Sequence, residues 1–299
     1  MPWLECVPNV SEGRDPAVID RLADALSTTP GVALLDVHRD AVHHRAVFTC
    51  IGEAAALQAG IVRLVGAAIE TIDLRQHHGA HPRIGAVDVV PFVPIGASTM
   101  DDAIAAARAT ADAVAAAHQV PVLLYEHAAS APHRRRLEHV RRGQFEGLAA
   151  KLRLPEWRPD AGPDVPHPTA GAIAMGARRL LVAWNINLAT DRLEVATAVA
   201  RAIRESSGGL PAVKAMGLAL PDRGVVQVSM NLVDVDITPM HVVYDAVARE
   251  AARHGVAIHE SELIGLVPAS ALGAVAADRL RIAGWQASRV LDARLVAGR

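Results

Sequence analysis

The sequence is poor in cysteine and in aromatic residues. Its 299 residues include two cysteines, and aromatic side chains make up 3% of the chain. Cys6 and Cys50 each lie in an apolar, strand-like run, so we expect buried, inert thiols rather than a disulfide framework or a cysteine-based metal site. Because aromatic residues are so few, alanine, valine and leucine must fill the core.

Signals of several functional classes are also missing. The formal net charge is −2, which argues against nucleic-acid binding because that binding needs a basic face. The N-terminus lacks a basic segment followed by an apolar one, and no apolar run approaches ~18 residues, so we expect neither a signal peptide nor membrane insertion. A cytoplasmic protein fits these features. Glycine-rich nucleotide loops and the Gly-x-Ser-x-Gly motif of serine hydrolases are absent too.

The chain has a composition typical of globular proteins. Apolar residues make up 51% of it, and its length predicts about two domains. Strand and helix patterns follow the order β-α-β-β-α-β twice, which is typical of a ferredoxin-like plait. We therefore predict an α+β fold of two such plaits with mainly antiparallel sheets. The predicted domains are residues 1–176 and 177–299, and the tail from Ala269 to about Val296 is predicted to be helical.

Individual boundaries have local signals. Asp15 followed by Pro16 predicts a helix start, since it places an N-cap acceptor before a proline in the first turn. Trp3 to Val10 predicts a first strand, and Val213–Leu220 with Val225–Leu232 predicts a hairpin. Residues 155–171 hold five prolines and two glycines and form a long loop, which is either functional or an inter-domain linker.

Histidine is abundant, with 14 in the chain. His77, His78 and His81 lie in a glycine-containing loop before an apolar run that predicts a buried strand. Pro82 favours an extended backbone at His81. A histidine in a loop on a rigid scaffold is suited to proton transfer, although most loop histidines are solvated or hydrogen-bonded bystanders.

A metal site is the competing interpretation of the histidines. His77, His78 and His81, with His43 and His44, would be its ligands. No HExxH motif or cysteine partner accompanies them, and acidic ligands are not close in sequence, so metal binding is the weaker hypothesis.

Other polar residues are candidates for substrate binding. Asn9, Ser11 and Glu12 follow a strand and either bind a polar substrate or form the turn and cap of the next helix. Arg45 either clasps a carboxylate through its planar fork or is a surface arginine. The basic cluster of Arg134–Arg136 with Arg141 and Arg142 is either a solvated helix face or an anion site.

Several segments resemble a known family. VPNVSEGRDPAVIDRLADAL, GVALLDVHRDAVHHRAVFTCIG and HHGAHPRIGAVDVVPFVPI resemble the N-terminal subdomain of the glutamate formimidoyltransferase family. LPEWRPDAGP, GARRLLVAWNINL, VVQVSMNLVDVDITPMHVVY and ELIGLVPASAL resemble its C-terminal subdomain. The resemblance extends to about residue 275, with the motifs in family order. The cyclodeaminase domain of the bifunctional animal proteins has no counterpart here.

This resemblance implies an activity and a set of site residues. The family transfers a formimidoyl group from N-formimidoyl-L-glutamate to tetrahydrofolate, the co-substrate, late in histidine breakdown, as a homodimer and with no metal expected. His81 of the HPRxG motif is implied as the acid/base. The chemistry of the transfer, rather than the resemblance, suggests Asp88 as a group that orients His81 or its loop. Polarity and charge, rather than the resemblance, make the following residues candidates for substrate binding: Asn9, Ser11, Glu12, His43, His44, Arg45 and Arg83. The implied folate-binding residues are Gly162, Pro163, Asp164, Val165, Pro166, His167, Pro168, Thr169, Ala170 and Gly171.

Two departures from the family pattern keep alternatives open. DAVHHR stands where bacterial members often have DPDHNR, and Ala170 stands where animal proteins carry a tryptophan. The alternatives are transfer with a different amine or with 5-formyltetrahydrofolate, a non-catalytic folate-binding protein, and a metal-dependent hydrolase that uses the histidine cluster.

Overall fold

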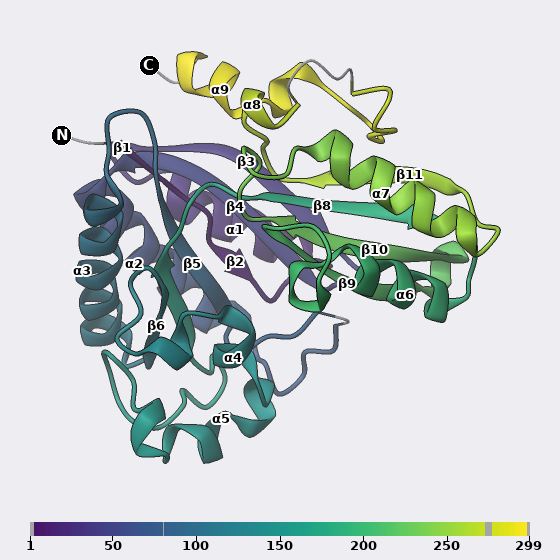
Figure 1. Ribbon diagram of the computed structural model, residues 1–299. Coiled ribbons are helices and arrows are strands. Elements are labelled where there is room, and N and C mark those ends of the chain that lie inside the picture. Colours follow the sequence, from purple (N-terminus) through teal and green to yellow (C-terminus); the bar gives the residue numbers. More distant parts are fainter. Residues whose placement is uncertain (1–2, 80, 273–276, 298–299) are drawn as a thin grey trace. The chain divides into compact units, whose positions relative to one another are not determined.

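The computed structural model describes residues 3–79, 81–272 and 277–297. The chain divides into two compact units, Met1–Arg179 and Leu180–Arg299 (Figure 1). Both units combine helices with sheets, and most strand pairs are antiparallel. The mixed α and β composition and the mainly antiparallel sheets are therefore confirmed.

The sheet of the first unit is larger than the four strands of one plait. β1 and β2 are successive parts of one line between β4 and β5. They are separated at Val7 and Pro8, since proline has no N–H for the ladder. β3 pairs with β4, and β7 and β6 extend the sheet beyond β5 through parallel pairs. The strands are β1 Trp3–Cys6, β2 Asn9–Val10, β3 Val32–Asp40, β4 Arg45–Glu53, β5 Val87–Pro94, β6 Val122–Glu126 and β7 Ile173–Ala177.

Helices cover both faces of this sheet. α1, α2 and α3 contribute to one large core, and α4 and α5 pack in a smaller cluster with β6 and β7. α1 begins where predicted, because the Asp15 carboxylate accepts the Ala17 N–H at 2.9 Å and Pro16 occupies the first turn. The helices are α1 Pro16–Ser27, α2 Ala54–Thr71, α3 Met100–His118, α4 Leu137–Arg141 and α5 Gln144–Leu152, with short 3₁₀ turns at Pro132–Arg134 and Pro155–Trp157.

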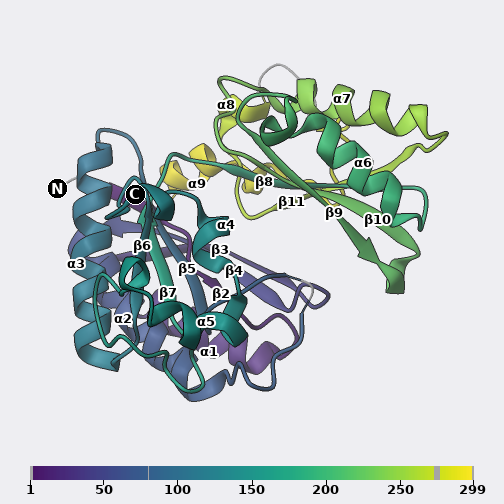
Figure 2. The ribbon, with the colours of Figure 1, turned by 60° about the horizontal axis from the view of Figure 1, so that its bottom comes forward.

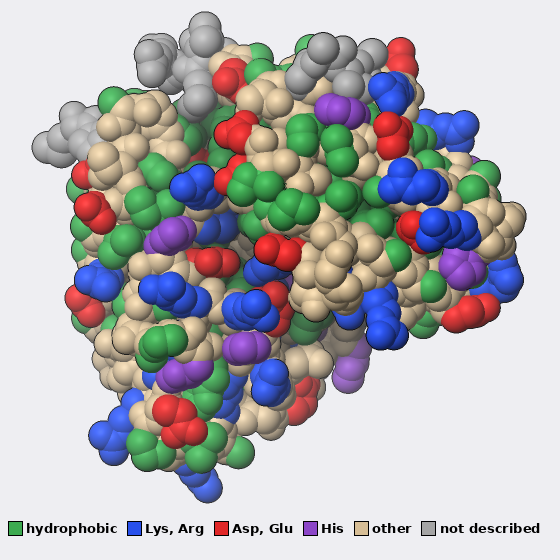
Figure 3. Space-filling view, viewed as in Figure 1, with side chains coloured by type: hydrophobic (Ala, Val, Ile, Leu, Met, Phe, Trp, Pro, Cys, Tyr) green, Lys and Arg blue, Asp and Glu red, His purple; other side chains and the backbone are tan. Residues whose placement is uncertain are grey.

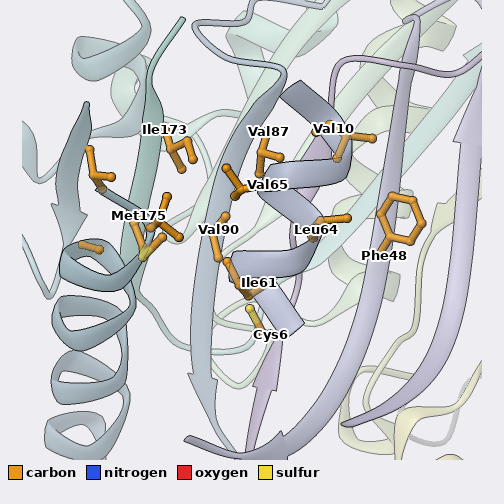
Figure 4. Packing of buried hydrophobic residues seen from close by; sticks show 14 of the residues in the cluster. Cys6, Val10, Phe48, Ile61, Leu64, Val65, Val87, Val90, Ile173 and Met175 are labelled. Atoms are coloured by element: carbon orange, nitrogen blue, oxygen red, sulfur yellow. The ribbon is translucent and has the colours of Figure 1, made fainter. Parts of the chain in front are cut away.

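α2 is a core helix of this unit. By length and composition alone it is apolar enough to cross a membrane, so the prediction that no apolar run approaches that length is wrong. Its residues Ile61, Leu64 and Val65 pack against the sheet beside Cys6 (Figure 4). The same helix lies side by side with α3 (Figure 1). Its apolar character is therefore explained by core packing.

The second unit has a four-stranded antiparallel sheet in the order β11-β8-β10-β9. α6 and α7 lie side by side on it (Figure 2) and share a core with Trp184 and Ile186. The β9–β10 hairpin has the predicted bounds, and Gly224 in its turn has φ 63°. The elements are β8 Val182–Leu188, α6 Leu193–Ile203, β9 Val213–Leu220, β10 Val225–Leu232, α7 Met240–Arg253, β11 Ile258–Ile264, α8 Ala269–Leu272 and α9 Leu291–Ala297, with 3₁₀ turns at Glu205–Ser207, Pro221–Arg223 and Ala287–Arg289.

Some elements differ from the sequence predictions. β7, Ile173–Ala177, was not predicted. The continuous helix predicted from Ala269 is wrong: α8 ends at Leu272, and turns occupy 277–280. Residues 273–276 of that prediction lie outside the described residues.

The two thiols behave as predicted. Cys6 and Cys50 are buried and free. They are directly opposite each other in β1 and β4, and the Cys50 thiol donates to the Cys6 carbonyl at 3.3 Å.

Candidate active site

A β-bulge in β5 defines the centre of the candidate site. Asn9 of β2 pairs with Val89, but the next residue of β2, Val10, pairs with Val87. Asp88 is therefore an extra residue that has no counterpart in β2. Bulges of this kind redirect a side chain and are common beside active sites.

Two arginines hold the Asp88 carboxylate. Asp88 is fully buried. Its Oδ2 accepts hydrogen bonds from Nη1 of Arg45 at 2.8 Å and from Nη2 of Arg141 at 2.6 Å, and its Oδ1 accepts the Ile84 N–H at 2.9 Å. Burial alone would raise the pKa of Asp88, but the Arg141 and Arg45 charges outweigh it and hold that pKa well below its usual range. Burial lowers the pKa of Arg45 to about 10, so Arg45 is charged at neutral pH.

His81 is half-buried beside this cluster. Its Nδ1 lies 2.8 Å from the Pro82 carbonyl oxygen. A carbonyl only accepts, so Nδ1 carries the proton and Nε2 has the free lone pair. Burial, and then the positive charges of Arg45 and Arg141, lower the pKa of His81 well below its ordinary value. The imidazole is therefore neutral at pH 7, and Nε2 is positioned to accept a proton.

A second histidine lies close to His81. The rings of His43 and His81 meet edge to face, with centroids 6.4 Å apart. Nδ1 of the buried His43 is 2.6 Å from Oδ2 of Asp40, and Oδ1 of Asp40 accepts the backbone N–H groups of Val42 and His43. Burial raises the pKa of Asp40, but these hydrogen bonds lower it more, to about 2. The Asp40 carboxylate therefore fixes both the turn and the orientation of the His43 ring.

His44 and His77 join two loops. Their rings stack with centroids 4.3 Å apart. Nδ1 of His44 accepts the Gly13 N–H at 3.2 Å, and Nε2 of His77 lies 2.9 Å from the His44 carbonyl. Burial lowers the pKa of both rings. A Cβ at Gly79 would lie 2.5 Å from the His43 carbonyl oxygen, so only glycine allows this approach.

Arg83 uses all of its hydrogen-bond donors within the protein. Nε donates to Nδ1 of His77 at 3.2 Å, and Nη2 donates to the His77 carbonyl at 3.3 Å. Both terminal nitrogens also donate to Glu146, at 2.9 and 2.6 Å, and Nη1 reaches Gln144 at 3.3 Å. Since an arginine has five N–H donors, a substrate carboxylate would have to displace Glu146.

The predicted residues of the N-terminal motif form protein contacts. Oδ1 of Asn9 accepts from Nε of Arg45 at 3.1 Å, and the Ser11 hydroxyl donates to the Gly85 carbonyl at 2.7 Å. Oε1 of Glu12 accepts the next three backbone N–H groups, at 2.8, 2.7 and 3.0 Å. These contacts link the start of α1 to β4 and to the segment after His81.

The loop from Gly162 to Gly171 is fixed to that same segment. The Ala170 carbonyl accepts the Ala86 N–H at 3.0 Å, and Nδ1 of His167 accepts the Ala170 N–H at 3.0 Å. Ala170 is buried in the first core, whereas Val165 is 60% exposed. The C-terminal half of this loop is therefore anchored near His81, and its tip is accessible.

The second unit carries a polar network that the sequence analysis did not identify. Gln227 and Glu260 both pair with Asn187 across β10, β8 and β11. Gln227 donates to Asn187 at 3.0 Å, and Asn187 donates to Glu262 at 3.1 Å. Arg223 contacts both Glu260 and Glu262. These residues are far apart in sequence, and the pairing of β8 with β10 and β11 brings them together.

Sequence reasoning also missed three charged residues of the first unit. Arg141, Glu146 and Asp40 contact predicted site residues. Arg141 belonged to the basic cluster for which an anion site was one interpretation, and that was its only sequence signal. Figure 3 shows arginine, lysine and histidine side chains interspersed with acidic ones over the side of the molecule that it draws. Among the described residues, no group of three or more His, Cys, Asp or Glu could hold a metal ion.

Comparisons with known proteins agree with the motifs. Residues 3–178 match the family model described as formiminotransferase domain, N-terminal subdomain, and residues 183–282 match the formiminotransferase domain. A glutamate formimidoyltransferase of Streptococcus pyogenes serotype M1 is 44% identical over 279 residues, which are 93% of each chain. That of Thermoplasma acidophilum is 40% identical and covers 99% of this chain and 98% of its own.

A longer relative matches over part of its length. The formimidoyltransferase-cyclodeaminase of Rattus norvegicus is 40% identical over 90% of this chain, which corresponds to 51% of the rat protein. The two family models and the full-length relatives lead to one conclusion: this chain belongs to the formiminotransferase family.

Proposed function

We propose that this protein transfers a formimidoyl group from N-formimidoyl-L-glutamate to tetrahydrofolate. The observation that carries the proposal is His81: its Nδ1 is committed to the Pro82 carbonyl at 2.8 Å, and its Nε2 has no hydrogen-bond partner among the described residues. Two glutamate formimidoyltransferases that align over nearly the whole chain support the choice of substrates. Tetrahydrofolate acts as co-substrate.

His81 acts as a base and then as an acid. The secondary amine of the reduced pteridine attacks the formimidoyl carbon, and Nε2 of His81 takes the proton that this nitrogen loses. The tetrahedral intermediate then breaks its bond to the glutamate nitrogen, and the imidazolium returns the proton to that leaving nitrogen. General acid–base catalysis of this kind contributes typically ~10²–10⁴-fold in rate. Both proton transfers use one atom, so no second acid is required.

The substrate carboxylate binds Arg45 in this proposal. Within the described part of the chain, Arg45 donates through Nε and Nη1, which leaves Nη2 for a ligand. Arg83 shares this role only if Glu146, with a side chain that is 64% exposed, moves away. His43 and His44 line the substrate side of the His81 loop. Asn9, Ser11 and Glu12 support the site through the contacts described above.

The loop from Gly162 to Gly171 binds folate. Its anchoring near His81 and its exposed tip support this role. The side chain of Ala170 packs into the core, so it is not an exposed platform for stacking, and folate contacts come from the rest of the loop.

Assembly and fold details complete the proposal. We propose two formiminotransferase subdomains, residues 1–176 and 177–299, each built on a ferredoxin-like plait. The orders β3-β4-β1/β2-β5 and β11-β8-β10-β9 support the plaits. We propose a homodimer that acts without metal, as the family resemblance implies. A cytoplasmic location without nucleic-acid or membrane binding is proposed from the charge and composition of the chain.

The test is formimidoyl transfer by wild type, His81→Ala and His78→Ala. His78 is an exposed neighbour in the same loop, so it serves as the matched control. We expect His81→Ala to lose at least ~100-fold in kcat with folate binding retained, and His78→Ala to match wild type. Equal activity of the two variants would refute the role of His81.

The wild-type assay also separates the alternatives. Folate binding without transfer from formimidoyl-glutamate would refute the proposed donor. Transfer from 5-formyltetrahydrofolate or to another amine would then identify a related transferase. Activity abolished by chelators and restored by a stoichiometric metal would indicate the hydrolase.

A further inference from the structure

Arg141 occupies an unusual position at the end of α4. Its side chain is 14% exposed, and its Nη2 donates to the fully buried Asp88 at 2.6 Å. Its Nε is buried and has no hydrogen-bond partner within the described part of the chain. An unsatisfied buried donor is costly and calls for an explanation. Solvation or simple packing does not supply one.

The surrounding structure holds Arg141 in place. Lys151 of α5 donates to the His139 carbonyl at 2.7 Å and to the Val140 carbonyl at 2.6 Å, which caps the short α4 helix. Val140 is fully buried in the cluster that α4 and α5 form with the sheet. The guanidinium is thus fixed by its helix on one side and by Asp88 on the other.

The charges that meet at Asp88 do not balance. Arg45 from β4 and Arg141 from α4 each carry a positive charge, and both donate to the same oxygen of Asp88 from β5. His43 also faces His81, edge to face, and its Nδ1 is held by the Asp40 carboxylate. Asp88 cancels one of the two guanidinium charges that bind it, so the cluster of Arg45, Asp88 and Arg141 keeps one net positive charge, while the Asp40 carboxylate is separated from His81 by the His43 ring.

We propose that Arg141 is a positioning residue that, through Asp88, keeps a second positive charge beside His81 and so keeps its imidazole neutral and ready to accept a proton. The inference rests on the proposed acid/base role of His81. It adds a residue on an element that carries no other predicted site residue. After His81 takes a proton, the same charge makes the imidazolium a stronger acid and favours return of the proton to the leaving nitrogen.

The test measures the titration of His81 directly. Ring NMR signals of labelled histidine are followed against pH in the free full-length protein, and His81→Ala serves only to assign the signal. The variants are Arg141→Met, Arg141→Lys and Arg142→Met. Arg142 is the exposed neighbour, so its variant removes the same charge without touching Asp88.

We expect the midpoint of His81 to move to higher pH in Arg141→Met and to stay at the wild-type value in the other two. The acid limb of the pH profile of kcat/KM moves in the same direction in Arg141→Met only. An unchanged midpoint in a folded Arg141→Met protein overturns the proposal. An equal shift in Arg142→Met does so too, because it would show a diffuse charge effect.

Two further comparisons cover a variant that does not fold and a wild-type protein that lacks transfer activity. If Arg141→Met does not fold, Arg141→Gln, which keeps a donor for Asp88 without the charge, replaces it in the comparison with Arg141→Lys. The titration needs no substrate. A wild-type protein that lacks transfer activity but shows the expected midpoints would refute the proposed function and leave the role of Arg141 intact.

Discussion

Replacing Asp88 by asparagine tests how the candidate site is held together. The carboxylate accepts from Arg45, Arg141 and the Ile84 N–H at 2.6–2.9 Å, and it is fully buried. Asparagine has nearly the same shape, so no cavity forms. One of its two polar atoms, however, is an NH₂ donor, which would face one or both guanidinium groups.

The expected loss of stability is large. Removing one partner of a buried ion pair typically costs about 3–5 kcal/mol, because the remaining charge is left uncompensated. Asp88→Asn leaves two buried arginine charges, those of Arg45 and Arg141, without a compensating carboxylate. For a unit of this size, such a loss lowers the Tm of the first unit by on the order of 10 °C. The matched comparison is Arg141→Met, which leaves Asp88 paired with Arg45 and should cost less.

The assay is urea unfolding of Asp88→Asn, Arg141→Met and the double variant, with unfolding of the first unit followed separately from that of the second. Arg141→Met should lower the free energy of unfolding by at least ~1 kcal/mol less in the Asp88→Asn protein than in the wild type, because in that variant it removes a charge that has already lost its partner. The pKa of Asp88 is lowered, so its contribution is present above the unfolded pKa of ~3.9 and is lost as pH falls through the lower folded value. A loss below ~0.5 kcal/mol at pH 7, or additive single effects, would refute this account.

Two further predictions concern the loops around the site. Gly171→Ala is expected to destabilise the protein by ~1–3 kcal/mol, since φ is 68° and the added Cβ would overlap the Ile84 carbonyl. The control is Gly208→Ala, which has φ 85° but open space around the added Cβ and should cost less. Equal losses of stability in urea unfolding would contradict the steric explanation. Glu146→Gln is expected to cost under ~1 kcal/mol because the carboxylate that pairs with Arg83 is largely exposed. The hydrogen bond from Arg83 lowers the pKa of Glu146, so this cost should be present at pH 7 and disappear as pH falls below the folded pKa; a pH-independent cost would count against the ion pair.

Much of the fold follows from local signals in the sequence. Asp15 and Pro16 fix the start of α1, and alternating apolar residues fix both strands of the β9–β10 hairpin. β7 was missed because Ile173–Ala177 is short and pairs in parallel with β5 and β6. Its partners are distant in sequence, so no local turn signals it. The tail was misassigned because its alanine-rich composition favours helix, whereas pairing of the tail with β11 and Val267 replaces helical hydrogen bonds.

The candidate site was only partly accessible to sequence reasoning. His81 stood out because a proline and a strand follow it, and Arg45 because its planar fork can bind a carboxylate. The bulge that redirects Asp88 depends on a register shift against β2, which no single-strand pattern reveals. Arg141 looked like any other arginine of a basic segment. Its burial depends on the packing of α4 against the sheet, a tertiary effect.

The histidine-rich loop illustrates why residue type alone does not define a metal site. A metal ligand needs an unshared imidazole lone pair. Nδ1 of His77 already accepts from Arg83, so its Nε2 carries the proton that is donated to the His44 carbonyl. Nδ1 of His44 accepts a backbone N–H. The hydrogen bonds of His77 therefore leave it no lone pair, and one nitrogen of His44 is committed. In His81, by contrast, the bond to Pro82 leaves Nε2 with its lone pair. Hydrogen bonding thus assigns different tasks to neighbouring histidines: His77 and His44 brace the loop, and His81 is left to exchange protons.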